Sequence, residues 1–226
     1  MLNKIFQNLY FFGLKGWIKR KVGSGMSLHD YSSRMVWQWR LAKLFGGAKI
    51  VMIGDSNMEG FALFRFMRRW KSVAVNIGIG GTTADGWVDF LTQTDRGNWL
   101  RREILISGAK VLFNVGGNNV LQRSVGRLPA NLKTLYSMFP SSWACLAPPI
   151  HLSFFASVID PRILGDDIKK LNDAIRETWK SRTIDLYAPF INPVTGEAFA
   201  GILRDPIHFS DVTMAVIIEW ESRILQ

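Results

Sequence analysis

The chain has 226 residues, of which 48% are hydrophobic and 20% charged, and this balance excludes an intrinsically disordered protein. Its single cysteine, Cys145, excludes an internal disulfide and a CxxC metal site, and three histidines leave few candidates for any imidazole chemistry. The formal net charge of +10 favours an anionic partner, but no nucleic-acid-binding motif accompanies the basic clusters, so we expect no nucleic acid.

The first 21 residues form a basic amphipathic segment, with apolar side chains at helical spacing and lysines between them. The apolar stretch is too short to span a bilayer, and it lacks the cleavage site of a signal peptide. Two interpretations stay open: a helix on an anionic membrane surface through residues 1–21, or a helix that packs on the domain or on another subunit. We therefore expect a protein that is cytoplasmic or peripheral to the membrane.

A second predicted helix follows a flexible break at residues 22–25, begins near Ser27 or Asp30 and ends at Phe45 before two glycines. Its inward face is predicted to carry Met35, Val36, Trp39, Leu41 and Leu44. Residues 1–47 are thus predicted to be an N-terminal helical extension, and residues 48–226 one α/β domain.

Strands alternate with helices along the rest of the chain. The predicted strands cover residues 49–53, 72–77, 110–115, 143–147 and 183–187. The predicted helices follow the first strand to about residue 70 and then cover residues 87–91, 99–106, 128–139, 163–179 and 212–225. This alternation predicts a parallel sheet covered by helices on both faces.

Polar or glycine-rich turns follow three of these strands, so we expect them at one rim of the sheet. Ser56 follows the first strand, Gly80-Gly81 the second, and Asn118-Asn119 the third. A late loop adds Asp205 and His208, three residues apart.

These residue types are the ones that acyl transfer from an ester needs. A serine is a weak nucleophile until a histidine removes its proton, and a carboxylate must hold that histidine in the correct tautomer. We therefore predict Ser56 as the nucleophile, His208 as its base and Asp205 as the orienting carboxylate. Gly81 and Asn118, with the backbone N–H of Ser56, are predicted to form the oxyanion hole.

Four sequence blocks together resemble the GDSL/SGNH hydrolase superfamily, over residues 49 to about 220. The blocks are Gly54-Asp55-Ser56 with Gly60, the stretch from Asn76 to Thr83, Gly116-Gly117-Asn118-Asn119, and Asp205-Pro206-Ile207-His208. The resemblance implies a flavodoxin-like three-layer sandwich with five parallel strands, and ester hydrolysis without a metal or cofactor. It assigns the oxyanion positions to Gly81 and Asn118.

Two residues depart from the pattern of that family. Asn57 replaces the usual leucine after the serine, which predicts a changed pocket lining rather than a changed mechanism. Asn119 stands where many members have aspartate, and the Asn-Asn pair is similar to the platelet-activating-factor acetylhydrolase type. That similarity favours short acyl groups.

The expected function is that of a serine esterase acting on a small ester, with an O-acetylated carbohydrate or another acetyl ester as first choice. A lysophospholipase or other lipid acyl hydrolase at a membrane surface is the second hypothesis, and a catalytically retired binding protein on the same fold is the third. We assign a structural role to Asp55. A structural role is favoured for His151 over a place in the lining of the substrate pocket, and it is not among the predicted catalytic residues. We expect Met58 and Phe61 beside the acyl pocket. The oligomeric state is not predicted.

Overall fold

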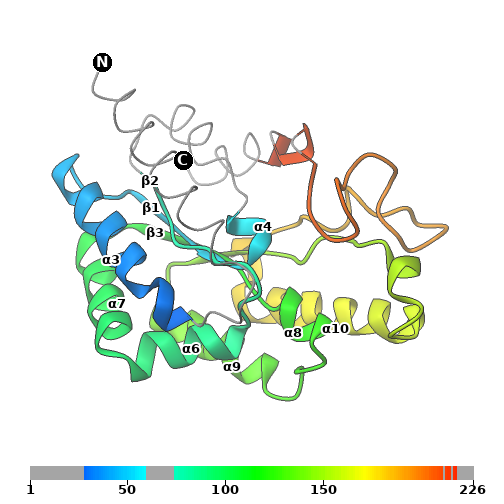
Figure 1. The fold of residues 1–226 in the computed structure, drawn as a ribbon, viewed down its shortest axis with the longest axis horizontal. Helices are drawn as coiled ribbons and strands as arrows, with labels where there is room; N and C mark the ends of the chain where they lie inside the picture. Colours follow the sequence, from blue (N-terminus) through cyan, green and yellow to red (C-terminus); the bar gives the residue numbers. More distant parts are fainter. Residues whose placement is uncertain (1–27, 60–73, 211, 215, 218–226) are drawn as a thin grey trace.

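The computed structural model describes residues 28–59, 74–210, 212–214 and 216–217 (Figure 1). The predicted amphipathic segment of residues 1–21 lies outside the described residues, as do Gly60, Phe61 and most of the predicted closing helix. Predictions that fall on these segments stay predictions.

Five parallel strands form one sheet in the order β2-β1-β3-β4-β5. The central strand β1 pairs with β2 on one side and β3 on the other, so that Val51 lies between Val75 and Val111. This strand order is that of flavodoxin-like folds and confirms the predicted five-stranded parallel sheet. The strands are β1 (Ile50–Gly54), β2 (Ala74–Asn76), β3 (Lys110–Asn114), β4 (Trp143–Cys145) and β5 (Thr183–Ile184).

Helices cover the sheet on both faces, as predicted. Five of them lie together on one face (Figure 1), and their bounds are α3 (Leu28–Leu44), α6 (Ala84–Gln93), α7 (Asp95–Ser107), α9 (Leu128–Met138) and α10 (Pro161–Trp179). On the other face lie the short α4 (Ser56–Glu59) and the described part of the C-terminal helix, at residues 212–214 and 216–217. Three short helices complete the described elements: α8 (Gly117–Leu121), η2 (Leu152–Phe155) and η3 (Lys180–Arg182).

The two faces of β1 feed two separate apolar cores, because successive side chains of a strand point to opposite sides. Val51 and Ile53 pack with the large helical layer, whereas Ile50 and Met52 pack with Met58 and the C-terminal residues. All five of these side chains are at most 1% exposed. The sheet is therefore buried on both faces, as its continuous apolar strands require.

The helix α3 packs against α6, α7 and β2. Met35 and Trp39 are buried in the core as predicted, but Leu44 is 81% exposed, so its predicted inward position is wrong. Leu44 is the last residue of α3, two positions beyond the last buried residue, Ala42, so nothing remains for it to pack on. The domain boundary at residue 47 stays a prediction.

The strands β4 and β5 are shorter than predicted. The backbone N–H of Ala147 donates to Asn172 Oδ1 at 2.8 Å, and its carbonyl accepts from Asn172 Nδ2 at 3.1 Å. The side chain of Asn172, which is buried on α10, thus satisfies the backbone that a longer β4 would have paired with a strand.

Candidate active site

The three residues predicted as nucleophile, base and orienting carboxylate lie in hydrogen-bond contact. Ser56 begins α4 directly after β1, and its Oγ lies 2.8 Å from His208 Nε2. His208 Nδ1 lies 2.8 Å from Asp205 Oδ1 and 2.7 Å from Oδ2. In a neutral imidazole this arrangement places the proton on Nδ1, where it is donated to the carboxylate, and leaves Nε2 to accept from the serine hydroxyl.

The carboxylate of Asp205 is held in place by its own turn. Its Oδ1 accepts from the backbone N–H of Ile207 at 3.1 Å and of His208 at 2.9 Å. Burial would raise the pKa of Asp205, but these hydrogen bonds and the neighbouring imidazole outweigh it and lower the pKa below its usual range. Asp205 is therefore ionised at neutral pH, which an orienting carboxylate requires.

The loop that carries His208 is fixed by Asn57, a role that the sequence did not predict. Asn57 Nδ2 donates to the carbonyl of Ile207 at 3.2 Å, and its Oδ1 accepts from the backbone N–H of Phe209 at 3.4 Å. The two residues that flank His208 are thus tied to the residue that follows the nucleophile. A leucine at this position could make neither bond, so Asn57 does more than line the pocket.

Glycines of the second block lie beside the nucleophile. A β-carbon at Gly80 would lie 3.4 Å from Ser56 Cβ, and the backbone N–H of Gly80 donates to Glu59 Oε2 at 2.7 Å. Gly81 has a φ of +79°, a conformation that side chains with a β-carbon rarely adopt. Among the described residues, no hydrogen bond uses the backbone N–H of Gly81 or of Ser56. Both donors are therefore available to an oxyanion.

The third predicted donor, Asn118, comes from α8 and lines the same cavity as Ser56. Its Nδ2 donates to the carbonyl of Thr82 at 3.0 Å. The hydroxyl of Thr82 in turn accepts from Trp87 Nε1 at 3.1 Å. This bond orients the amide of Asn118 and leaves its second N–H for a ligand.

A small cavity of about 40 Å³, partly open to solvent, lies beside Ser56 and Asn118. Met58 does not line this cavity but is buried in the core beneath β1, so its predicted position beside the acyl pocket is wrong. The apolar part of the lining consists of Val120, Leu121, Ala147, Pro148, Ile150, Ile168 and Ile207. An apolar cavity next to a nucleophile and an amide donor suits the acyl group of an ester.

No protein-family model matches the sequence, and no curated protein matches it. The structure is similar to that of a GDSL-like lipase from Bacteroides thetaiotaomicron, with a TM-score of 0.58 and 15% identity over 83% of this chain and 98% of that one. It is similar to an acetyl xylan esterase, with a TM-score of 0.55 and 16% identity over 76% and 98% of the two chains. A member of the lipolytic G-D-S-L family from Veillonella parvula gives a TM-score of 0.50 and 16% identity over 76% and 96%.

The chain has the SGNH hydrolase fold. The match extends over nearly the whole length of each of these structures, and it confirms the fold that the four sequence blocks implied.

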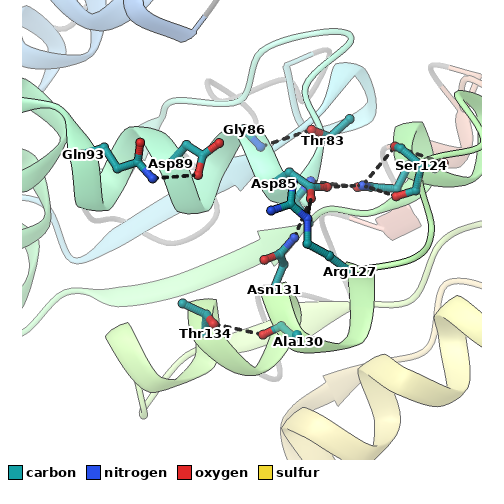
Figure 2. A network of polar contacts seen from close by, with 12 residues as sticks. Thr83, Asp85, Gly86, Asp89, Gln93, Ser124, Arg127, Ala130, Asn131 and Thr134 are labelled. Atoms are coloured by element: carbon teal, nitrogen blue, oxygen red, sulfur yellow. Dashed lines mark hydrogen bonds and ion pairs between the residues drawn. The ribbon is translucent and has the colours of Figure 1, made fainter.

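Asn119 departs from the SGNH pattern for a reason that the structure supplies. Its buried side chain accepts from the backbone N–H of Ala84 at 2.8 Å and donates to Asp85 Oδ2 at 2.5 Å. Figure 2 shows Asp85 at the centre of this network, where its other oxygen accepts from Asn131 at 2.7 Å and lies 3.8 Å from Arg127 Nε. An aspartate at position 119 would place a second carboxylate against Asp85, so the amide is the compatible group here.

Asp55 is a buried carboxyl group within the candidate site, and it lines the cavity together with Ser56. Burial raises its pKa from the ordinary 3.8 to about 6, although the backbone N–H of Asn57 at 3.0 Å and the charge of His208 oppose the rise. The ionised form is thus disfavoured by burial and favoured by an imidazolium at His208.

We expect Asp55→Asn to make the protein more stable at pH 7.5 than the unsubstituted chain. The folded state keeps the proton of Asp55 up to a higher pH than the unfolded state, so Asp55 lowers the free energy of unfolding as pH rises from about 4 to 7. The full effect is on the order of 3 kcal/mol above pH 7 and vanishes below pH 4. Urea unfolding of both proteins at pH 4, 5.5 and 7.5 measures it, and a difference that does not change with pH would contradict it.

Other kinds of site are not found within the described parts of the chain. There, no group of three or more His, Cys, Asp and Glu side chains is arranged to hold a metal ion. None of the helices in the same parts is both long and apolar enough to cross a membrane. Cys145 is buried in the core at the end of β4.

Proposed function

We propose that the protein is a serine esterase that hydrolyses small carboxylic esters through an acyl-enzyme at Ser56. One observation carries the proposal: the unbroken contact from Asp205 through His208 to Ser56, with 2.7 Å and 2.8 Å between the joined atoms. Nucleophile, base and orienting carboxylate in this order are the arrangement that activates a serine.

The reaction follows from the positions of these groups. His208 Nε2 takes the proton of Ser56 as its Oγ attacks the ester carbonyl, and Asp205 stabilises the imidazolium that forms. The backbone N–H groups of Ser56 and Gly81 and the amide of Asn118 donate to the oxyanion. His208 then gives the proton to the leaving alcohol. A water molecule, deprotonated by His208, releases the carboxylic acid and restores Ser56.

The cavity beside Ser56 supports a short acyl group. Its volume of about 40 Å³ is well below the roughly 150 Å³ of a cavity that binds benzene. This space suits the methyl group of an acetyl ester better than an eight-carbon chain. We therefore propose acetyl esters as the preferred substrates.

We expect kcat/KM to fall steeply with acyl length, by about 100-fold from p-nitrophenyl acetate to the octanoate. Leu121 lines the cavity and is only partly buried, so Leu121→Ala enlarges it at modest cost in stability. In that variant, kcat/KM for p-nitrophenyl butyrate is expected to rise relative to that for the acetate. The measurement is a series of p-nitrophenyl esters from two to eight carbons, and rates that rise toward octanoate would contradict the acetyl preference.

The same series addresses the lipid alternative, because a lysophospholipase is expected to prefer the long chains. Membrane contact through residues 1–21 stays a prediction, since that segment lies outside the described residues. The contact between Ser56 and His208 favours an esterase over a catalytically retired binding protein, because binding alone does not need an activated serine.

A further inference from the structure

A second, open hollow lies on the far side of the loop that carries Asp205 and His208. This groove has a volume of about 440 Å³. One of its walls is formed by His151, Ser153 and Phe154, and the other by residues 203–206. The proposed reaction does not use this groove.

The groove adjoins the proposed catalytic residues directly. Asp205 lines it, while Ile207, two residues further on, lines the acyl cavity. The walls are joined by a hydrogen bond from the backbone N–H of His151 to the carbonyl of Pro206 at 3.0 Å. Because the acyl cavity holds little more than a methyl group, the alcohol part of an ester must lie outside it. The groove is a space of sufficient size beside Asp205, which is joined to Ser56 through His208.

An exposed aromatic ring stands in this groove. Phe154 is 66% exposed, and its ring is packed at 81° against that of Phe155, with 5.3 Å between the ring centres. The face of an aromatic ring carries partial negative charge and attracts the weakly positive C–H groups of a ligand. A sugar ring offers such C–H groups on its faces and hydroxyl groups at its edge.

The fixed positive charge in the groove lining, that of Arg204, is paired with a carboxylate, which disfavours an anionic ligand. Arg204 Nε lies 3.5 Å from Asp205 Oδ2, and His151 Nδ1 lies 3.8 Å from Glu197 Oε2. Glu197 is held in place because its Oε1 accepts from the backbone N–H of Ser153 at 2.7 Å. Each basic side chain thus already has an acidic neighbour, whereas a phosphate site needs basic groups in excess. Paired polar groups still offer donors and acceptors to hydroxyls.

We infer that this groove binds the carbohydrate part of an O-acetylated neutral oligosaccharide, with a sugar ring stacked on Phe154. The inference rests on the proposed esterase activity, but sugar binding can be measured without turnover. The acetyl group would then enter the cavity beside Ser56 while the sugar chain extends past Asp205.

Isothermal titration calorimetry of the full chain with xylotetraose tests this inference. We expect saturable binding that Phe154→Ala weakens by about tenfold, because truncating an aromatic contact at the centre of a site typically has an effect of this size. Phe199→Ala is the matched control, since Phe199 is also exposed, at 43%, but does not line the groove. The control variant is expected to bind like the unsubstituted chain.

Kinetics separate this inference from the proposed function. We expect Phe154→Ala to reduce kcat/KM for acetylated xylo-oligosaccharide about tenfold more than for p-nitrophenyl acetate. The groove assignment is overturned if xylotetraose does not bind, if both Phe variants bind it equally, or if glycerophosphocholine binds in its place. If the unsubstituted chain binds xylotetraose but hydrolyses neither ester, the proposed function is overturned and the groove assignment stands.

Discussion

Replacing Ser56 with alanine is expected to reduce kcat for p-nitrophenyl acetate by at least about 10⁴-fold while the protein stays folded. The change removes only the hydroxyl that lies 2.8 Å from His208 Nε2. His208, Gly81 and Asn118 remain, but without the nucleophile no acyl-enzyme forms. Steady-state kinetics with the purified variant measure the loss, and circular dichroism checks the fold.

Ser137→Ala is the matched control for this substitution. Ser137 lies on α9, where its hydroxyl donates to the carbonyl of Thr134 and takes no part in the site. The control is expected to keep its activity within twofold. A Ser56→Ala protein that retains more than about 1% of the activity would show that another group attacks the ester.

Gly54→Ala is expected to lower the free energy of unfolding by about 3 kcal/mol. Gly54 is the last residue of β1, and a β-carbon there would lie 2.4 Å from the carbonyl oxygen of Asn114 and 2.8 Å from Met58 Cβ. Neither neighbour can move easily, because the Asn114 carbonyl accepts from Asp55 N–H at 3.1 Å and Met58 is buried. We also expect lower activity, since Asp55 and Ser56 follow directly.

Gly126→Ala is the control for the glycine substitution. A β-carbon at Gly126 would meet no atom within 4 Å, and this glycine does not have a positive φ. We expect its free energy of unfolding to change by less than about 0.5 kcal/mol in urea denaturation followed by circular dichroism. Equal stability of the two variants would mean that the end of β1 tolerates a side chain.

The sheet and the rim on which the candidate residues lie were predictable because their signals are local. Apolar strands that end in a polar or glycine-rich turn mark one rim of a parallel sheet, and Ser56, Gly81 and Asn118 follow three such strands. Asp205 and His208 were found through their spacing in the chain. The positions of Ser56, Gly81 and Asn118 relative to one another then follow from the strand order, whereas those of Asp205 and His208 required the structure.

The contacts that hold the site together were not predictable, because they join segments far apart in the chain. Asn57 donates a hydrogen bond to the carbonyl of Ile207, which precedes His208 and lies 150 residues away in the chain. Nothing in the sequence near Asn57 indicates that partner. Asn172 likewise ends β4, because its side chain forms hydrogen bonds with the backbone N–H and carbonyl of Ala147. Asn119 was noticed as a departure from a family pattern, but its reason, the adjacent Asp85, required the fold.

Asp55 is expected to lower the stability of the protein while it raises kcat. A buried carboxyl whose pKa is raised to about 6 lowers the free energy of unfolding at neutral pH. The same charge favours an imidazolium at His208, which forms in the proposed reaction. A gain in stability with a loss of kcat in Asp55→Asn is the combination expected of a group that serves the reaction.

Labelling with a fluorophosphonate probe, followed by mass spectrometry of the digested protein, tests the central claim most directly. The probe reacts with a serine whose hydroxyl has been activated by a base. We predict one adduct, on Ser56, and its loss in the full-length His208→Ala variant. An adduct on another residue, or labelling of Ser56 that persists unchanged without His208, would contradict the claim that His208 activates Ser56 as the nucleophile.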